Sequence, residues 1–458
     1  MPALGPRLIV AGTHSGVGKT TVATGLMAAL RRRGLVVAPA KVGPDFIDPG
    51  YHALATGRPG RNLDPWICGE KTVAALAGRA AANADVLVVE GVMGLFDGAA
   101  DPRGPITALG PRRPVASTAS VASLLGAPVV LVVDASALSG SVAALVHGYA
   151  SWDPALALAG VVLNRVGSDS HEAMLRAALA PLGLPVLGVL RRDDGLRWRD
   201  RHLGLVPVAE DEAGLRRSVD ALAGTVARRC DLDALLAVAR SAPRRAVPRA
   251  GEARPSGRAR VAVLGGRSFS FSYPDNLELL EQAGAEIVPF DPEIDDRLPP
   301  AVDALYAGGG FPEVFAARLA ANRPLLDDVG RRVAGGLVTW AECGGLLWLA
   351  RSLDGHRMAG AVPADTRMTD RLTLGYRRSR PLVDTPLAAA GTELRGHEFH
   401  YSTCEPGGDA LEWRGREGGG RSGFASPTLM ASYLHLHLAA DPGLAERFVG
   451  TAAAGVRG

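Results

Sequence analysis

Short, continuously apolar segments alternate with longer segments of helical length through the first half of the chain. The apolar runs RLIVAG, DVLVVEG, PVVLVVD, LAGVVLNRV and PVLGVL are rich in Val, Ile and Leu, and Ala- and Leu-rich stretches such as residues 20–33 and 142–150 lie between them. Uninterrupted apolar runs are typical of strands that are buried on both faces, and strands that alternate with helices form parallel sheets. The pattern predicts a doubly wound α/β domain.

The alternation stops at residues 241–257, SAPRRAVPRAGEARPSG, where Pro, Arg and Gly replace the periodic apolar residues. Such a segment cannot build a core, so it indicates a linker. A second alternation follows in RVAVLGG, NLELLEQAG, AEIVPF, ALYAGGG and GLVTWAEC. We therefore expect two α/β domains, residues 1–240 and 258–458, joined by the linker 241–257.

Bulk properties narrow the class of protein. The 458 residues suffice for two or three domains, and a net charge of +3 gives no support for nucleic-acid or acidic-membrane partners. No apolar run approaches the ~18 residues of a membrane span. The four cysteines are far apart and form no CxxC pair, which argues against a zinc site or a disulfide framework. We expect a soluble, cytoplasmic protein that binds neither nucleic acid nor membrane.

The segment LIVAGTHSGVGKTT places a glycine-rich turn between a predicted strand and a predicted helix. Backbone N–H groups of such a turn bind phosphate, Lys19 can reach the terminal phosphates, and the Thr20 hydroxyl can bind Mg²⁺. The usual pattern has Gly where this chain has Thr13, and the alternative is a glycine-rich turn with a coincidental lysine. The strand and helix context favours an ATP site, formed by Thr13, Gly16, Gly18, Lys19, Thr20 and Thr21.

Two carboxylates are candidates for the Mg²⁺ that accompanies ATP, because this ion prefers oxygen ligands. Glu90 ends the apolar run DVLVVE, at the strand edge where open α/β sheets bind ligands, and Asp45 lies in the loop KVGPDFIDPGYH. Lys41, in the same segment, is a candidate second cation for the nucleotide phosphates. For all three the alternative is an ordinary solvated loop residue.

A second candidate site lies in the other predicted domain. Cys343 stands between an apolar strand and an apolar helix in GLVTWAECGGLL, a position that suits a nucleophile whose thiolate and oxyanion are stabilised by nearby N–H groups. The loop YAGGGFPE could supply the second half of an oxyanion hole, so we assign Gly310 and Gly344 to that hole. His435, in ASYLHLHL, is the candidate base. A lone cysteine is otherwise more often inert packing.

Ten motifs in this order resemble the cobyrinate and hydrogenobyrinate a,c-diamide synthases, a glutamine amidotransferase family of cobalamin biosynthesis. The resemblance covers nearly the whole chain, through GTHSGVGKTT, KVGPDFIDPGYH, NLDPW, VVEGVMGLFDG, RHLGLVP, YPDNLELL, GGGFPE, AECGGL, GHEFHYS and SYLHLH. It implies an N-terminal P-loop domain similar to dethiobiotin synthetase, whose G-T-x-x-x-x-G-K-T loop accounts for Thr13. It also implies a C-terminal domain similar to class I glutamine amidotransferases.

The resemblance further implies an activity. ATP would phosphorylate a carboxylate of cobyrinate or hydrogenobyrinate, and ammonia released from glutamine through a Cys343 thioester would displace the phosphate, at the a and c acetate groups. Asp45, Glu90 and Asp97 fall on the family's acidic positions, which are associated with the magnesium nucleotide and the macrocycle, and we assign Asp97 to the substrate. A homodimer is compatible with the sequence, which does not fix the oligomeric state.

One departure from other class I enzymes concerns the catalytic triad. Their His-x-Glu reads His435, Leu436 and His437 here, so the third member is missing or replaced and the role of His437 stays open. His397 and His400, in GHEFHYS, are expected to pack or to contact substrate. Arginines that could contact the carboxylates of a corrin rim, or simply be solvated, are Arg165, Arg192, Arg197, Arg199 and Arg201.

Three alternatives remain. Cobyric acid synthase belongs to the same family and amidates four other side chains, but KVGPDFIDPGYH and RHLGLVP favour the a,c enzyme. A nickel-sirohydrochlorin a,c-diamide synthase would use similar chemistry. A partition-type ATPase switch belongs to a different class; it would need a second lysine early in the loop, where this chain has His14, and would give the Cys343 domain no purpose.

Overall fold

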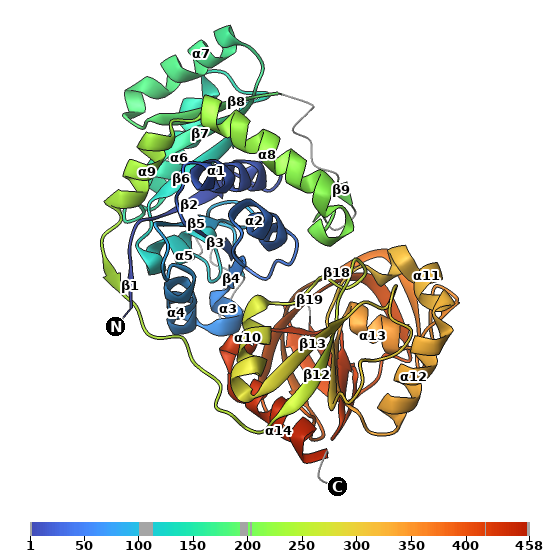
Figure 1. Cartoon of the computed structure of the whole chain (residues 1–458). Helices are drawn as coiled ribbons and strands as arrows, with labels where there is room; N and C mark the ends of the chain where they lie inside the picture. Colours follow the sequence, from blue (N-terminus) through green and yellow to red (C-terminus); the bar gives the residue numbers. More distant parts are fainter. Residues whose placement is uncertain (1, 100–112, 193–199, 202–203, 417, 456–458) are drawn as a thin grey trace. The chain divides into compact units, whose positions relative to one another are not determined.

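The computed structural model describes residues 2–99, 113–192, 200–201, 204–416 and 418–455 (Figure 1). The chain divides into two compact units, Met1–Ala250 and Gly251–Gly458. No helix of the described ranges is long and apolar enough to cross a membrane.

The first unit is built on a seven-stranded parallel sheet with the strand order β4-β3-β5-β2-β6-β7-β8. The strands are β2 (Arg7–Gly12), β3 (Val37–Val42), β4 (Arg61–Leu63), β5 (Val86–Glu90), β6 (Val129–Asp134), β7 (Leu158–Val166) and β8 (Val186–Arg191). Every residue of β2, β3 and β5 is buried, which is why these segments are apolar throughout.

Helices connect these strands. They are α1 (Lys19–Arg32), α2 (Asp48–Thr56), α3 (Pro65–Cys68), α4 (Glu70–Ala80), α5 (Thr118–Leu125), α6 (Ser141–Trp152), α7 (Asp169–Leu179), α8 (Glu212–Arg229) and α9 (Leu232–Ser241), with the short 3-10 helices η1 (Ala180–Leu182) and η3 (Val208–Glu210). Two residues each form the hairpin β9 (Asp200–Arg201) and β10 (Gly204–Leu205). The predicted helices 20–33 and 142–150 correspond to α1 and α6.

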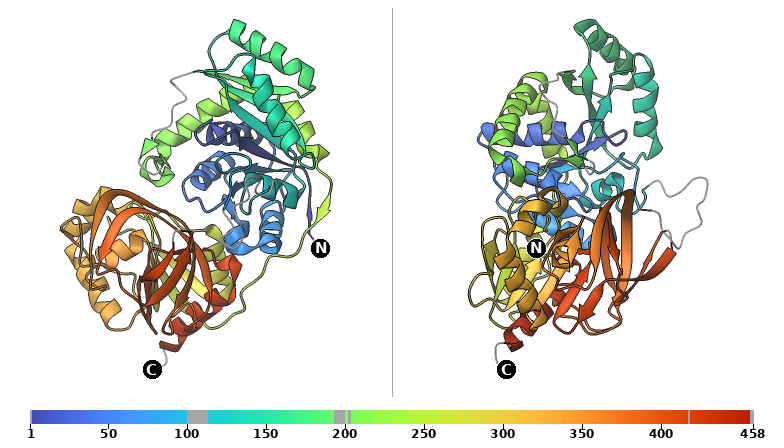
Figure 2. Two further views of the ribbon diagram at one scale, coloured as in Figure 1. Left: turned by 180° about the vertical axis from the view of Figure 1, so that it is seen from behind. Right: turned by 90° about the vertical axis from the view of Figure 1, so that its right-hand side faces the viewer.

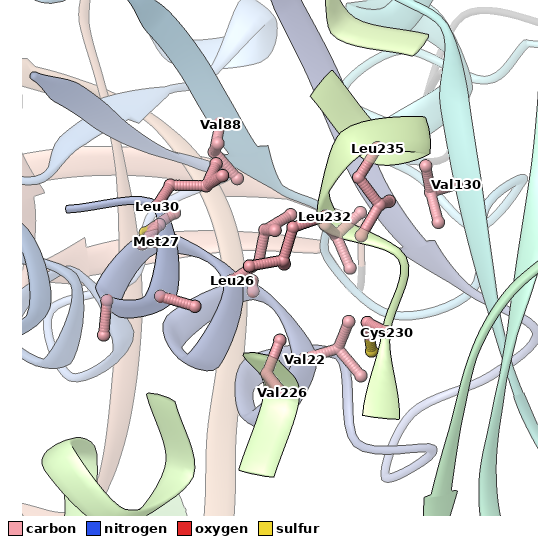
Figure 3. Close-up of a cluster of buried hydrophobic side chains, with 14 of the residues drawn as sticks. Val22, Leu26, Met27, Leu30, Val88, Val130, Val226, Cys230, Leu232 and Leu235 are labelled. Carbon is pink, nitrogen blue, oxygen red and sulfur yellow. The ribbon is translucent and has the colours of Figure 1, made fainter. Parts of the chain in front are cut away.

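The core of the first unit lies between α1 and the C-terminal helices α8 and α9. Side chains of α1, α8 and α9 meet valines of the sheet there (Figure 3), among them Val22, Leu26, Met27, Leu30, Val88, Val130, Val226, Leu232 and Leu235. Gly25 lets α1 and α8 approach closely, because a Cβ at this position would lie 2.5 Å from a methyl of Val226. This packing fixes α1, and with it the loop that precedes α1.

Part of the predicted linker is held on the first unit. Strand β11 (Arg245–Ala246) pairs with β1 (Ala3–Leu4), antiparallel. The buried guanidinium of Arg7 donates hydrogen bonds to the carbonyls of Pro243 and Leu125, both at 2.7 Å. These contacts attach the chain to the first unit as far as Ala246.

The second unit contains a six-stranded sheet in the order β13-β12-β14-β15-β23-β22, parallel except for β22. The strands are β12 (Ala259–Leu264), β13 (Ala285–Phe290), β14 (Ala304–Ala307), β15 (Val338–Glu342), β22 (Phe424–Ser426) and β23 (Leu429–Ser432). The helices are α10 (Pro274–Ala283), α11 (Ala316–Ala321), α12 (Arg323–Ala334), α13 (Gly344–Leu349) and α14 (Gly443–Gly455), with η4 (Pro312–Phe315) and η5 (Leu438–Ala440).

A second sheet in this unit, mostly antiparallel, was not predicted from the sequence. It consists of β16 (Ser352–Leu353), β17 (His356–Arg357), β18 (Asp365–Pro381), β19 (Leu394–Glu405), β20 (Leu411–Gly415), β21 (Gly418–Ser422) and β24 (His435–Leu436). Its long orange strands lie beside the yellow strands of the parallel sheet (Figure 2). The edge strand β24 pairs with β19 and places His435 opposite His397.

Candidate functional site

The predicted phosphate loop follows β2 and leads into α1. Gly16 and Gly18 have φ angles of 81° and 96°, in the left-handed region that favours glycine. Lys19 opens α1, and its Nζ donates to the carbonyl of His14 at 3.1 Å, across the loop. The loop therefore has the strand, turn and helix geometry of a phosphate site.

Thr20 and two residues of neighbouring strands meet beside this loop. Lys41 of β3 and Glu90 of β5 are opposite each other in the strand register, at the carboxyl edge of the sheet. The Nζ of Lys41 donates to Glu90 Oε1 at 2.9 Å and to the Gly91 carbonyl at 3.1 Å. The Thr20 hydroxyl donates to the same Glu90 oxygen at 2.7 Å. The structure thus brings together three of the side chains that the sequence predicted.

Two further side chains complete this cluster and were missed by the sequence analysis. Asp48 Oδ2 accepts from Lys41 Nζ at 2.6 Å and from the Thr20 hydroxyl at 3.4 Å. His52 Nε2 lies 2.6 Å from Glu90 Oε2. Asp48 and His52 are four residues apart at the start of α2, so they share one helix face. That spacing within KVGPDFIDPGYH was a signal that could have identified them.

Asp45, the other predicted metal ligand, lies at the border of this cluster. Its Oδ1 accepts from the backbone N–H groups of Ile47 and Asp48, at 2.8 and 3.0 Å, and so stabilises the entry to α2. Its Oδ2 lies 3.9 Å from Lys41 Nζ, with the side chain 30% exposed. Asp45 therefore borders the cluster, whereas Asp48 lies within it.

The charges of this cluster are strongly coupled. Burial would lower the pKa of Lys41, but Asp48 and Glu90 outweigh burial and raise it. Burial would likewise raise the pKa of Glu90, but Lys41 and His52 hold it below the ordinary value. Asp48, which shares Lys41 with Glu90, has its pKa raised by burial and by Asp45 and Glu90. Lys41 and Glu90 thus form a buried ion pair, and Asp48 is the carboxylate that takes up a proton more readily.

Lys19 has a pKa lowered to about 8, first by burial and then by the charge of Lys41. Asp97 is close enough to oppose this shift, and its Oδ2 accepts from the N–H of Gly94 at 2.8 Å. The predicted substrate residue therefore lies beside the phosphate loop. Tyr149 reaches the loop from α6, because its hydroxyl donates to the carbonyl of Thr13 and its ring stacks on Phe96 at 5.8 Å.

The composition of the chain gives Lys19 and Lys41 added weight. The sequence contains only three lysines, the third being Lys71, although Lys and Arg together number 50. The lysine ammonium is a compact charge, whereas the arginine guanidinium is larger and planar. The two side chains are therefore not interchangeable at a crowded phosphate site. Lys41 lies in this cluster and Lys19 lies in the phosphate loop beside it.

The cluster fits a Mg²⁺ ion that binds together with a nucleotide. The Thr20 hydroxyl, Glu90 Oε1 and Asp48 Oδ2 converge on one region and are oxygen ligands of the kind that Mg²⁺ prefers. In the part of the chain that the structure describes, no group of three or more His, Cys, Asp or Glu side chains is placed to hold a metal. Thr20, Glu90 and Asp48 are the side chains that would hold Mg²⁺ here.

In the second unit, Cys343 lies at a sharp turn between β15 and α13. Its φ and ψ angles are 48° and −104°, a strained conformation for a residue other than glycine. Gly345 allows the close approach to β14, because a Cβ at Gly345 would lie 2.1 Å from the carbonyl oxygen of Ala307. This strand-to-helix elbow is the geometry expected of a nucleophile at the edge of a parallel sheet, and Cys343 is 6% exposed.

The two residues predicted for the oxyanion hole lie beside this turn. A Cβ on Gly344 would be 2.9 Å from the backbone N of Gly310, so the two backbones are almost in contact. Gly310 is itself crowded, since a Cβ there would lie 2.1 Å from the carbonyl oxygen of Ser268. The glycines therefore bring backbone N–H groups close to Cys343, as an oxyanion hole requires.

His435 is the titratable side chain placed next to Cys343. It is 2% exposed, and its pKa is raised to about 10. Burial would lower that pKa, but hydrogen bonding and charge from the Cys343 thiol and from Glu342 outweigh it. His435 is therefore placed to take a proton from the thiol and to stay charged beside a thiolate.

His437 and His397 have different surroundings from His435. His437 follows β24, accepts from the N–H of Ala439 through Nδ1 at 3.3 Å, and faces Asp275 at 3.9 Å. His397 stacks on His435, with ring centroids 5.0 Å apart, and its pKa is well below 6.5 because of burial and the charge of His435. Burial also lowers the pKa of His400, to about 4.

Two of the other cysteines have thiols that are poor nucleophiles. Burial raises the pKa of the Cys230 thiol to about 12, and burial together with Glu405 raises that of Cys404 to about 11. Thiols with such pKa values stay protonated near neutral pH. Neither resembles Cys343, which has a histidine beside it.

The predicted substrate arginines are only partly described. Arg165 donates to the carbonyl of Gly16 at 2.9 Å and pairs with Asp134, so it supports the phosphate loop. Arg192 is exposed. Arg197, Arg199 and the side chain of Arg201 lie outside the described residues.

Comparisons with known proteins match a family model to each half of the chain. Residues 8–206 match the family model described as the CobQ/CobB/MinD/ParA nucleotide binding domain, and residues 260–443 match the CobB/CobQ-like glutamine amidotransferase domain. The hydrogenobyrinate a,c-diamide synthases of Streptomyces coelicolor and Mycobacterium bovis are 50% and 47% identical to this chain, in each case over 97% of both chains.

A cobyrinate a,c-diamide synthase of Syntrophotalea carbinolica is 45% identical, over 97% of this chain and 98% of its own. The similarity to these synthases extends over the amidotransferase domain as well. It therefore argues against the alternative that the chain is a partition-type ATPase. It also confirms the predicted architecture, a P-loop α/β domain followed by an amidotransferase domain. The chain therefore belongs to the family of hydrogenobyrinate and cobyrinate a,c-diamide synthases, in which a nucleotide-binding domain is joined to a glutamine amidotransferase domain.

Proposed function

We propose that this chain uses ATP and glutamine to amidate the a and c acetate carboxylates of hydrogenobyrinate or cobyrinate, through an acyl phosphate, in cobalamin biosynthesis. The observation that carries the proposal is the separation of two reactive sets within one chain. Lys19, Lys41 and Glu90 meet at a phosphate loop in the first unit, and Cys343 meets His435 in the second. One set suits phosphoryl transfer and the other suits release of ammonia.

In the first unit the loop from Thr13 to Thr21 would bind the ATP phosphates. Lys19 and Lys41 would neutralise the charge of the transferred phosphoryl group, and Asp97 would orient the macrocycle. Thr20, Glu90 and Asp48 would hold Mg²⁺, with Asp45 at the edge of the same site. Such an ion would supply positive charge that offsets the negative charge of the phosphates. The substrate carboxylate then attacks the terminal phosphorus and ADP leaves. Ammonia attacks the carbonyl carbon of the resulting acyl phosphate and displaces phosphate, which gives the amide.

In the second unit the Cys343 thiolate would attack the side-chain amide carbon of glutamine. The N–H groups of Gly310 and Gly344 would stabilise the oxyanion, and His435 would give a proton to the departing ammonia. Water then hydrolyses the glutamyl thioester. We assign residues 1–240 to the ATP-binding domain, 258–458 to the glutaminase domain, and 241–257 to the connection.

Relatives named for the cobalt-free substrate favour hydrogenobyrinate over cobyrinate. Identity is 47–50% to five hydrogenobyrinate enzymes and 40–45% to three cobyrinate enzymes. Incubation with Mg-ATP, glutamine and each macrocycle, followed by mass spectrometry, tests both choices. Two amidations are expected, whereas four amidations would indicate cobyric acid synthase chemistry. No amidation of either macrocycle would contradict the proposal, and sedimentation of the purified chain would test a homodimer.

The division of labour is tested by Cys343→Ala. This variant should lose amidation with glutamine and keep it with ammonium salt, because the thiol serves only ammonia release. Cys404→Ala is the matched control: it removes another buried thiol of the same unit, one with a raised pKa, and should keep both activities. Equal loss with both nitrogen donors in Cys343→Ala would contradict the assignment.

A further inference from the structure

The base of the proposed glutaminase needs a group that fixes its orientation. A histidine acts as a base through one nitrogen only if the other nitrogen is held with its proton, and a carboxylate usually holds it. The position two residues after His435, which carries glutamate in other class I enzymes, is His437 here. His437 faces Asp275 and caps η5, so it does not replace that carboxylate.

A buried carboxylate lies next to His435 from another part of the chain. Glu342 is the last residue of β15, directly before the nucleophile, and is 1% exposed. Its Oε2 lies 3.8 Å from His435 Nδ1, at ion-pair distance. Its Oε1 accepts from the N–H of Leu436 at 2.7 Å, and the hydroxyl of Tyr306 donates to Oε2 at 3.2 Å. Glu342 therefore contacts both the ring of His435 and the backbone that follows it.

We propose that Glu342 is the third member of this triad, a positioning residue that holds the proton on His435 Nδ1 and so directs Nε2 to Cys343. The proposal rests on the proposed glutaminase function of Cys343. It also explains the order of residues in AEC, because a residue at the end of a parallel strand lies at the same sheet edge as the nucleophile that follows it. The carboxylate is supplied by β15 and the histidine by β24.

Other charged groups near His435 are less suited to this role. Those that act on it electrostatically are His397, Glu398 and His400 of β19, besides Cys343 and Glu342. Glu398 is paired with Arg377 at 2.9 Å. His397 and His400 have lowered pKa values, so they are neutral and supply no negative charge. Within the described residues, Glu342 is the carboxylate that the ion-pair geometry places against His435.

The charge of Glu342 also has an electrostatic consequence. It stabilises imidazolium, and imidazolium in turn stabilises the Cys343 thiolate, so the carboxylate acts on the nucleophile through His435. Glutamine at this position would keep an acceptor for the N–H of Leu436 but would turn an amide N–H₂ or a neutral oxygen toward Nδ1. Glu342→Gln therefore removes the charge while leaving the shape and one backbone hydrogen bond in place.

The test uses the full-length chain and compares Glu342→Gln with Asp275→Asn. Asp275 is the matched control, because it is an equally buried carboxylate that faces the neighbouring histidine His437. Glu342→Gln should lower kcat for glutamine-dependent amidation by about 100-fold or more, with a smaller change in KM for glutamine. The rate of Cys343 alkylation by iodoacetamide should shift to higher pH. Asp275→Asn should leave that pH profile unchanged.

Activity with ammonium salt separates this inference from the proposed function. Glu342→Gln should keep it, and Glu342→Asp should restore part of the glutamine activity, which a purely structural role in β15 would not predict. If Cys343→Ala loses glutamine use but Glu342→Gln keeps both its rate and its alkylation profile, the triad inference fails and the proposed function stands. An alkylation profile shifted by Asp275→Asn instead would also overturn the inference.

Discussion

The replacement Lys41→Met tests how the first unit holds its buried charges. Lys41 Nζ is within 2.9 Å of oxygens of both Asp48 and Glu90, and its side chain is 4% exposed. Methionine has a similar length and removes only the charge and the donors. Two acidic groups would then face each other and Thr20 without the ammonium between them. This is unfavourable because the Glu90 side chain is fully buried and that of Asp48 is only 14% exposed.

The expected loss of stability is large. Removing one partner of a buried ion pair costs about 3–5 kcal/mol, because the remaining charge stays buried and unpaired. Lys71 on α4 is exposed. Its replacement should therefore change the free energy of unfolding by no more than about 0.5 kcal/mol. Lys71→Met is therefore the matched control for the loss of a lysine charge.

Hydrogen exchange followed by mass spectrometry is the appropriate assay, because a chain with two compact units need not unfold in a single step. Amides of β3 and β5 should exchange about 10²–10⁴-fold faster in Lys41→Met, while those of β12 and β14 should be unchanged. Mg²⁺ can replace the ammonium, and at 100 times its Kd it would restore about 2.7 kcal/mol. Protection within tenfold of the parent chain, without Mg²⁺ at pH 7, would refute the reasoning.

The pH dependence should also change. In the parent chain the lowered pKa of Glu90 gives stability that is present above its ordinary pKa and is lost as the pH falls through the lower folded value. Without Lys41 the carboxyl pKa values in the folded chain rise above those of the unfolded chain. The folded variant then binds more protons, so Lys41→Met should gain stability as the pH falls from 7 to 5. A variant that loses stability over this interval would contradict the assignment of the charges.

Two further predictions concern the loop and the elbow. Lys19 has a pKa of about 8, and ATP phosphates should raise it, so nucleotide binding at pH 8 should take up about half a proton, measured by calorimetry in buffers of different ionisation enthalpy. Identical heats in all buffers would contradict this. Gly345→Ala would force a Cβ to within 2.1 Å of the Ala307 carbonyl and should destabilise the second unit by about 1–3 kcal/mol in thermal unfolding. Gly265→Ala, whose Cβ would lie no nearer than 3.6 Å to another group, is the control.

The parts of the fold that are determined by residues close together in the sequence could be predicted. The phosphate loop is fixed by a strand, a turn and a helix within some 25 consecutive residues, and α1 lies within one residue of the predicted 20–33 at each end. The antiparallel sheet of the second unit was missed. Strand β18 mixes exposed arginines with half-buried residues and pairs with β19 across a connection of more than ten residues, so no short pattern indicates it.

The candidate sites show the same limit. Glu90 was predicted at the end of a strand and Cys343 directly after one, and both lie there, because a parallel sheet brings such ends to one edge. Lys41 was predicted in a loop, whereas it lies in β3. Asp45 was proposed from its place in a loop, and Asp48 was not singled out. The start of α2 turns the Asp48 carboxylate toward Thr20. His435 was predicted as the base from its place in ASYLHLHL, and it lies in β24 beside Cys343.

Both units place most of their reactive groups at the carboxyl edge of a parallel sheet. His435 is the exception, and its position accounts for the absence of a glutamate two residues after it. Lys41 and Glu90 lie at the carboxyl edge of one parallel sheet, and Glu342 with Cys343 lies at that of the other. His435 comes instead from the edge of the antiparallel sheet, where its strand has only two residues and the chain turns at once into η5. A carboxylate two residues further on would follow that turn away from the imidazole. A carboxylate that precedes the nucleophile stays with the parallel sheet, and this geometry favours Glu342 as the partner of the base.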